Sequence, residues 1–195
     1  MRRAPDRLLA AATLAGLALL ALPPVRRLLE SSMSLHMLVQ FPLLVAAGYL
    51  LARTLPAGWR RPLDAWNAHG TAGLLACALT LMVVMIPRLL DLVLVDARFE
   101  AAKWLALLAC GAALQLSWSR AGLLVQAFFL GNVLPMMAAA GQLYQDAPLR
   151  LCNAYLLDDQ VRLGQGLVIL SLIAAAVAIA AGLRRANLWP ARAHS

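Results

Sequence analysis

The chain is a succession of long apolar runs separated by short polar connections. A helix that crosses a bilayer needs roughly 20 mainly apolar residues, and the strands of a membrane barrel would show an alternating polarity that these runs lack. The pattern therefore predicts an all-α, polytopic membrane helix bundle with about six transmembrane helices. These spans are expected at about residues 8–24, 33–52, 70–87, 102–118, 122–143 and 163–183.

Composition supports a membrane protein and limits its partners. Of 195 residues, 63% are hydrophobic and only 13% are charged, more apolar surface than a soluble domain of this size could bury. The formal net charge is +8, which attraction to anionic lipid explains without any nucleic acid. No long linker or internal repeat interrupts the runs, so residues 1–195 are interpreted as a single integral membrane domain.

The first apolar run could be a signal peptide or a retained helix. It follows the basic segment MRRAPDR, as a signal peptide would. No convincing small-x-small cleavage site comes after it, and Arg26 and Arg27 follow almost at once. We therefore expect an uncleaved transmembrane helix.

The distribution of basic residues predicts the orientation. If the N-terminus is inside, ten of the 17 basic residues are inner and seven are outer. Lys and Arg concentrate on the cytoplasmic side of membrane proteins, so both termini are expected in the cytoplasm, in a bacterial cytoplasmic (inner) membrane. The inner residues are Arg2, Arg3, Arg7, Arg53, Arg60, Arg61, Arg120, Arg184, Arg185 and Arg192, and the outer ones are Arg26, Arg27, Arg88, Arg98, Lys103, Arg150 and Arg162.

This orientation places soft metal ligands at the outer ends of several spans. Met33, His36 and Met37 share one face of the second span, because residues three and four apart lie together on a helix. Thioether, thiolate and imidazole together suit Cu(I) better than hard ions. The alternative is that the methionines fill gaps between helices and His36 bonds a neighbour at the interface. The candidate metal ligands are His36, Met37, Met33, Met85, Met136, Cys152 and Asp159.

Three further interpretations concern local structure. Residues 88–103 mix apolar and charged positions and are expected to form an outer interfacial helix. Asp158 or Asp159 can cap the last helix. Cys77 and Cys110 lie within spans and are expected to act as small hydrophobic residues, so no structural disulfide within the chain is predicted.

Two segments resemble a known family. HMLVQFPLLVAAG at 36–48 resembles the signature span of the CtaG-like cytochrome c oxidase assembly factors, and LLDDQVRLGQGLV at 156–168 resembles their D-Q-x-x-G-G-L element. The resemblance covers about residues 31–183. The family's second histidine is Gln40 here, and the family usually has seven spans. The matched residues are His36, Met37, Asp159, Gln160 and Gly166.

The resemblance implies a membrane-embedded assembly factor for a haem-copper oxidase that binds or delivers Cu(I) on the outer face. Its partners would be an oxidase subunit or a copper chaperone. An enzyme is not expected, because only Asp158 and Asp159 offer a carboxylate pair. A small transporter or channel, which would call for ionisable groups in mid-membrane, and a scaffold subunit without metal remain as alternatives.

Overall fold

The computed structural model describes residues 4–56, 58 and 65–187, and within these ranges the regular structure is entirely helical. Five helices are long and apolar enough to cross a membrane, or six if one bent pair counts as a span. The predicted all-α bundle is thus confirmed, and the protein is an integral membrane protein that lies in a lipid bilayer. Arg2, Arg3, Arg60, Arg61 and Arg192 lie outside the described residues.

The helices follow one another with short breaks. In chain order they are α1 (Ala4–Ala21), α2 (Pro23–Leu29), α3 (Met33–Leu35), the π-helix η1 (His36–Gln40), α4 (Phe41–Arg53), α6 (Thr71–Val84), α7 (Pro87–Val95), α8 (Ala97–Trp118), α9 (Leu123–Asp146) and α10 (Leu157–Asn187). Together α3, η1 and α4 form one continuous span, Met33–Arg53.

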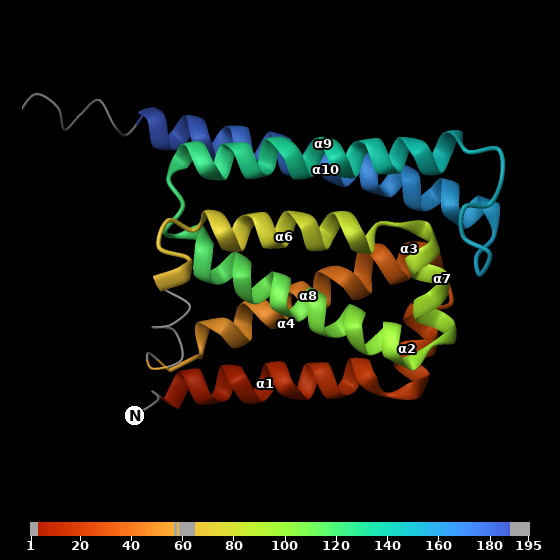
Figure 1. The fold of residues 1–195 in the computed structure, drawn as a ribbon, viewed down its shortest axis with the longest axis horizontal. Coiled ribbons are helices and arrows are strands. Elements are labelled where there is room, and N and C mark those ends of the chain that lie inside the picture. Colours follow the sequence, from red (N-terminus) through yellow and green to blue (C-terminus); the bar gives the residue numbers. More distant parts are fainter. Residues whose placement is uncertain (1–3, 57, 59–64, 188–195) are drawn as a thin grey trace, which may run out of the picture.

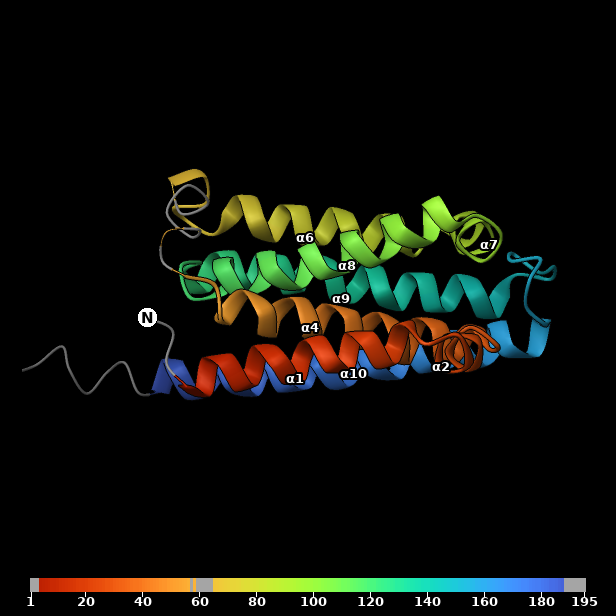
Figure 2. The same ribbon diagram turned by 90° about the horizontal axis from the view of Figure 1, so that it is seen from below.

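The long helices run back and forth along one common axis (Figure 1). Helices α2, α3 and α7 and the connection between α9 and α10 gather at one end, which we call the Lys103 end. The described start of α1 and the described end of α10 are both at the opposite end, on opposite edges of the bundle in Figure 1, and Figure 2 shows this end from a second direction. The first described helix thus begins, and the last one ends, at the same end of the bundle, as they would if the bent pair α6–α7 counted as the sixth span.

Prolines and one acidic cap set the breaks at the Lys103 end. The first helix stops at Ala21 because Leu22 is extended and Pro23 begins α2. The third apolar run divides into α6 and α7, which meet at 76° where Pro87 begins the second piece.

The structure corrects the prediction of one interfacial helix over residues 88–103. Only its first part, α7, is a separate helix. Asp96 then caps α8 by accepting from the backbone N–H of Arg98 at 2.8 Å. Glu100 and Lys103 therefore belong to the first turns of the long helix α8.

Helices α4 and α8 are in direct backbone contact. A Cβ on Gly48 would collide with the carbonyl oxygen of Leu108, and one on Gly111 would collide with that of Val45. Small residues allow such approach between membrane helices. The contact holds η1, which continues into α4, close to the start of α8.

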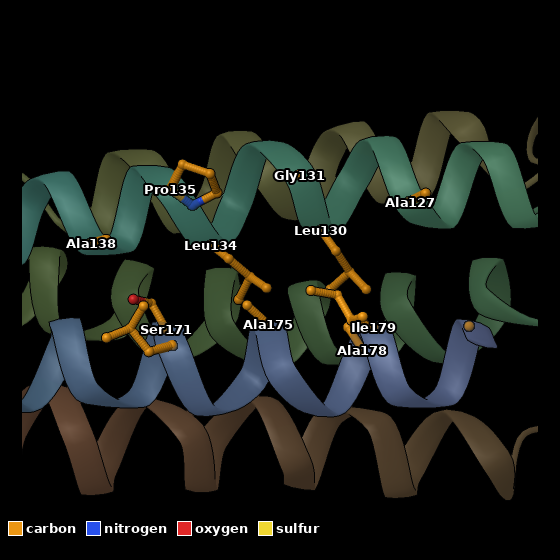
Figure 3. A pocket seen from close by; sticks show the side chains of 12 residues that line it. Ala127, Leu130, Gly131, Leu134, Pro135, Ala138, Ser171, Ala175, Ala178 and Ile179 are labelled. Carbon is orange, nitrogen blue, oxygen red and sulfur yellow. The ribbon is translucent and has the colours of Figure 1, made fainter. Parts of the chain in front are cut away.

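Between α9 and α10 lies an apolar groove of about 500 Å³ (Figure 3). Leu130 and Leu134 line it from α9, and Ala175 and Ile179 line it from α10. The hydroxyl of Ser171, also in its lining, donates to the carbonyl of Val168 at 2.7 Å. The groove thus presents hydrocarbon, as expected of a lipid-facing surface.

Candidate functional site

The Lys103 end buries an ammonium group inside a cage of acceptors. Lys103 is only 4% exposed. Its Nζ lies 3.0 Å from Glu30 Oε1, 3.0 Å from His36 Nε2 and 2.9 Å from Gln40 Oε1. An ammonium has three hydrogens, so these acceptors use all of them. We call Glu30, His36, Gln40, Lys103 and Tyr155 the Lys103 network.

The π-helix η1 presents two of these acceptors. His36 and Gln40 are both fully buried, and the N–H of Phe41 donates to the carbonyl of His36 in the wider π register. The next residue, Pro42, has no N–H to donate, which disturbs the α-helical bonding of this turn. Single π turns are frequent at functional sites.

The hydrogen bonds of His36 fix the tautomer of its ring. Because the Lys103 ammonium can only donate, His36 Nε2 accepts and the ring proton lies on Nδ1. Nδ1 then donates to the Tyr155 hydroxyl at 2.8 Å, which donates in turn to the Glu30 carbonyl at 3.2 Å. The Phe41 ring packs edge-on against His36, with centroids 5.2 Å apart. Both ring nitrogens of His36 are therefore engaged within the chain.

Ion pairs connect the network to the surface. Arg26 Nη1 lies 2.9 Å from Glu100 Oε2, and Arg26 Nε lies 3.7 Å from Glu30 Oε2. The Arg26 side chain is 39% exposed, whereas that of Lys103 is 2% exposed. Two cations thus face two carboxylates, which balances the charge of this end of the bundle.

The connection between α9 and α10 closes over the network. Gln160 accepts from the Leu151 N–H at 2.8 Å and donates to the Tyr144 carbonyl at 3.0 Å. Asp91 accepts from the backbone N–H groups of Asn153 and Ala154. These bonds hold the segment that carries Cys152 and Tyr155.

Burial changes the acidity of both side chains in that segment. The Cys152 thiol donates to the Pro87 carbonyl at 3.3 Å. Burial, and to a lesser extent the nearby Asp91 carboxylate, raises the pKa of Cys152 to about 12. Burial and the Glu30 carboxylate also raise the pKa of Tyr155 above its ordinary value. Both groups are therefore neutral near pH 7.

Asp159 caps a helix other than its own. Its carboxylate accepts from the backbone N–H of Met33 and from the hydroxyls of Ser32 at 2.9 Å and Ser34 at 3.0 Å. From the sequence, Asp158 or Asp159 is expected to cap the last helix. For Asp159 that assignment is wrong, because it joins α10 to the start of the Met33–Arg53 span.

Several of the expected soft ligands belong to one extended apolar cluster. Met33 and Met37 belong to one buried cluster with Cys152 and Tyr155, and Met85 packs against that cluster. On α9 it is Met137 that packs against the cluster, whereas the expected Met136 is not among its members. Met82 is 50% exposed and lies outside it.

These donors do not form a conventional metal centre. Among the described residues, no group of three or more His, Cys, Asp and Glu side chains is placed to hold a metal ion. A metal at the Lys103 end would rest mainly on thioethers, which bind Cu(I) but not hard ions.

Sequence reasoning missed four members of the network: Glu30, Gln40, Lys103 and Tyr155. One available signal was Lys103 itself, which begins the predicted 102–118 span. An ionisable residue in a membrane span is by default a functional-site hypothesis. The contacts of Glu30 and Tyr155 depend on packing between segments far apart in the chain.

Comparisons with known proteins add no identification. No family model matches the chain, and neither a curated protein nor a solved structure does. The resemblance to the CtaG-like assembly factors therefore rests on the two short segments alone.

Proposed function

We propose that the protein is a membrane-embedded assembly factor for a haem-copper respiratory oxidase, which takes up and releases Cu(I) at the Lys103 end. One observation carries the proposal. Met33, Met37, Met85 and Cys152 come from three separate segments and pack into one cluster, next to the His36 that the family resemblance also marks.

The donors suit transient rather than permanent binding. Thioethers are neutral ligands that favour Cu(I). A thiol must lose its proton to become a strong ligand, and the Cys152 thiol, with its pKa raised to about 12, keeps it near pH 7. A site of thioethers without a thiolate holds Cu(I) weakly enough to hand it on.

His36 would join such a site only through an exchange of cations. Its Nε2 accepts from Lys103 in the metal-free arrangement. If Cu(I) bound at Nε2 and the Lys103 ammonium released one proton to solvent, the added and lost charges would cancel and the charge facing Glu30 would stay unchanged. In this proposal Lys103 keeps the imidazole occupied until copper arrives.

Copper competition tests the site. Purified protein in detergent, kept reduced, would compete for Cu(I) with a coloured chelator. We expect the Met33→Leu/Met37→Leu variant to lose at least about tenfold in affinity, since Leu matches Met in volume but offers no sulfur. Met82→Leu is the matched control, because Met82 lies outside the cluster. Equal Cu(I) affinity of both variants and the unchanged protein would overturn the copper site.

Oxidase activity tests the biological role. Host cells that carry Met33→Leu/Met37→Leu should assemble less copper-loaded oxidase at unchanged abundance of this protein. Cells with Met82→Leu should behave as wild type. Unchanged oxidase copper content in the double variant would remove the delivery role.

A scaffold without metal is the second candidate, and a specific observation favours it. All three hydrogens of the Lys103 ammonium and both nitrogens of His36 find partners within the chain. In this second proposal, the satisfied network has a single role, which is to fix the shape of the Lys103 end for a partner subunit. In that case Lys103 variants would impair oxidase assembly, whereas the methionine variants would not.

A further inference from the structure

A second pair of reactive side chains lies inside the bundle, outside the Lys103 network. Cys77 on α6 and Cys110 on α8 are 1% and 2% exposed. Their sulfur atoms are 2.7 Å apart, and both cysteines are free thiols. The proposed copper site uses neither of them.

The packing of α6 against α8 brings these two short side chains together. Gly73 lies one helical turn before Cys77, and a Cβ there would collide with Ser117 Oγ. Ser117 is about two turns beyond Cys110 on α8, so the two helices run antiparallel and stay close from one contact to the other. The cysteines meet because the backbones are near, not because long side chains reach across.

We infer that Cys77 and Cys110 form a reversible disulfide that clamps α6 to α8, with a membrane quinone as the oxidant. The two S–H bonds break and one S–S bond forms. The two electrons and two protons released reduce the quinone to a quinol. The 2.7 Å between the sulfur atoms is already near the ~2.05 Å of an S–S bond.

The surroundings of the pair favour a lipid-soluble oxidant. Both cysteines belong to an apolar cluster with Leu74, Phe129 and Val133. Because both thiols are buried, any oxidant reaches them only when α6 and α8 separate locally. Leu75 and Leu79, on the face of α6 opposite Cys77, are 62% and 49% exposed, so the molecules that surround this helix in the bilayer are hydrocarbon-soluble.

The third cysteine takes no part in this reaction. Cys152 lies at the Lys103 end, where its thiol donates to the Pro87 carbonyl. Of the three cysteines, one pair is thus joined and one thiol is left over. The number of free thiols therefore shows directly whether the Cys77–Cys110 disulfide has formed.

The test oxidises the full-length protein in lipid nanodiscs. Reduced protein is treated with duroquinone, whose fully substituted ring cannot add to thiols, then denatured and alkylated with N-ethylmaleimide. Mass spectrometry should count three adducts before the quinone and one adduct after it, with the protein itself about 2 Da lighter. The remaining adduct should map to Cys152.

Variants identify the bond. Cys77→Ser and Cys110→Ser should each keep both remaining thiols after quinone treatment, whereas Cys152→Ser should lose both of its thiols. Three adducts on the quinone-treated wild type would overturn the inference. So would a loss of thiols that appears only as a cross-linked dimer on a non-reducing gel.

Discussion

Helix α8 carries a buried polar side chain near each of its ends, and the two are stabilised in different ways. Near its start, the charged Lys103 bonds Glu30 just after α2 and both His36 and Gln40 of η1, and His36 in turn bonds Tyr155 of the connection before α10. Near its end, Ser117 accepts from Asn67 at 2.8 Å, and Asn67 accepts from the Gly73 N–H at 3.0 Å. We call Asn67, Gly73 and Ser117 the Asn67 cluster.

This difference in charge distinguishes the Asn67 cluster, which has a structural role, from the Lys103 network, which is a candidate functional site. The Asn67 cluster is neutral, and its bonds fix the start of α6 against the end of α8, which explains it fully. Buried ion pairs, in contrast, are often no more stable than well-packed apolar residues, because both charges must leave water. The Lys103 network is therefore not explained by stability alone, which is the physical ground for placing function there.

The largest effect expected is from removing the buried ammonium. Lys103→Met should lower the free energy of unfolding by up to about 3–5 kcal/mol, because it removes the closer of the two cations that face the largely buried Glu30 carboxylate and leaves only the longer contact with Arg26. Thermal unfolding in detergent measures this loss. Arg27→Met, which removes an exposed cation from α2, should change stability by less than about 0.5 kcal/mol.

A second substitution decides whether charge is the cause. If the under-compensated Glu30 charge is responsible, Glu30→Gln added to Lys103→Met should restore much of the lost stability. A double variant as unstable as Lys103→Met alone would show that the ionic description of this end is wrong. The contrast with the neutral Asn67 cluster would then disappear.

The next effect is at the opposite end. Gly73→Ala should destabilise the protein by about 1–3 kcal/mol, because the added methyl group meets Ser117 Oγ and lies 3.0 Å from Asn67 Nδ2. Gly16→Ala on α1 is the matched control, since nothing lies within 4 Å of its added Cβ; helix propensity alone predicts a slight gain there. If the two variants unfold at the same temperature, α6 and α8 are not in close contact.

The fold followed from sequence because hydrophobic runs report on the membrane directly. Runs of sufficient length predicted helices and their approximate places. Their ends were less predictable, since they depend on local chemistry: Pro23 ended the first span early, and Asp96 started α8 before the predicted boundary at 102. That second difference places Lys103 inside the long helix α8, whereas the predictions had it where an interfacial helix and a span overlap.

The candidate site was predicted only in part, because it depends on which helices become neighbours. Helical spacing placed Met33, His36 and Met37 on one face, and all three are buried. No spacing rule links Lys103 to Glu30, 73 residues earlier in the chain, or assigns Asp159 to the N-terminus of a different helix. Charges within apolar runs are the signal that would have found Lys103.

A smaller effect is expected from the Asp159 cap. Asp159→Asn removes the negative charge facing the start of the Met33–Arg53 span and should lower stability by about 1 kcal/mol. Asp158→Asn alters the exposed neighbouring carboxylate and should be nearly neutral. Denaturation of the two variants side by side checks this, and equal effects would mean that Asp159 acts only through general surface charge.

The last effect is absent at neutral pH and grows only above about pH 9. It is a response to alkaline pH that only the Lys103 end should show, because Asn67, Gly73 and Ser117 do not titrate. The pKa of Cys152 rises on folding from an ordinary value of 9.0 to about 12. The folded thiol holds its proton more firmly, so this contribution to stability is complete below about pH 9 and is lost as the pH rises towards 12.

Alkylation measures the same pKa shift, since only the thiolate reacts. The rate at native Cys152 should keep rising about tenfold per pH unit from 9 to nearly 12. An Asn153→Cys/Cys152→Ser variant places its thiol at an exposed neighbouring position and should reach its plateau near pH 9. Rates that level off at the same pH in both proteins would show that Cys152 is not shielded and that this end of the bundle is open to water.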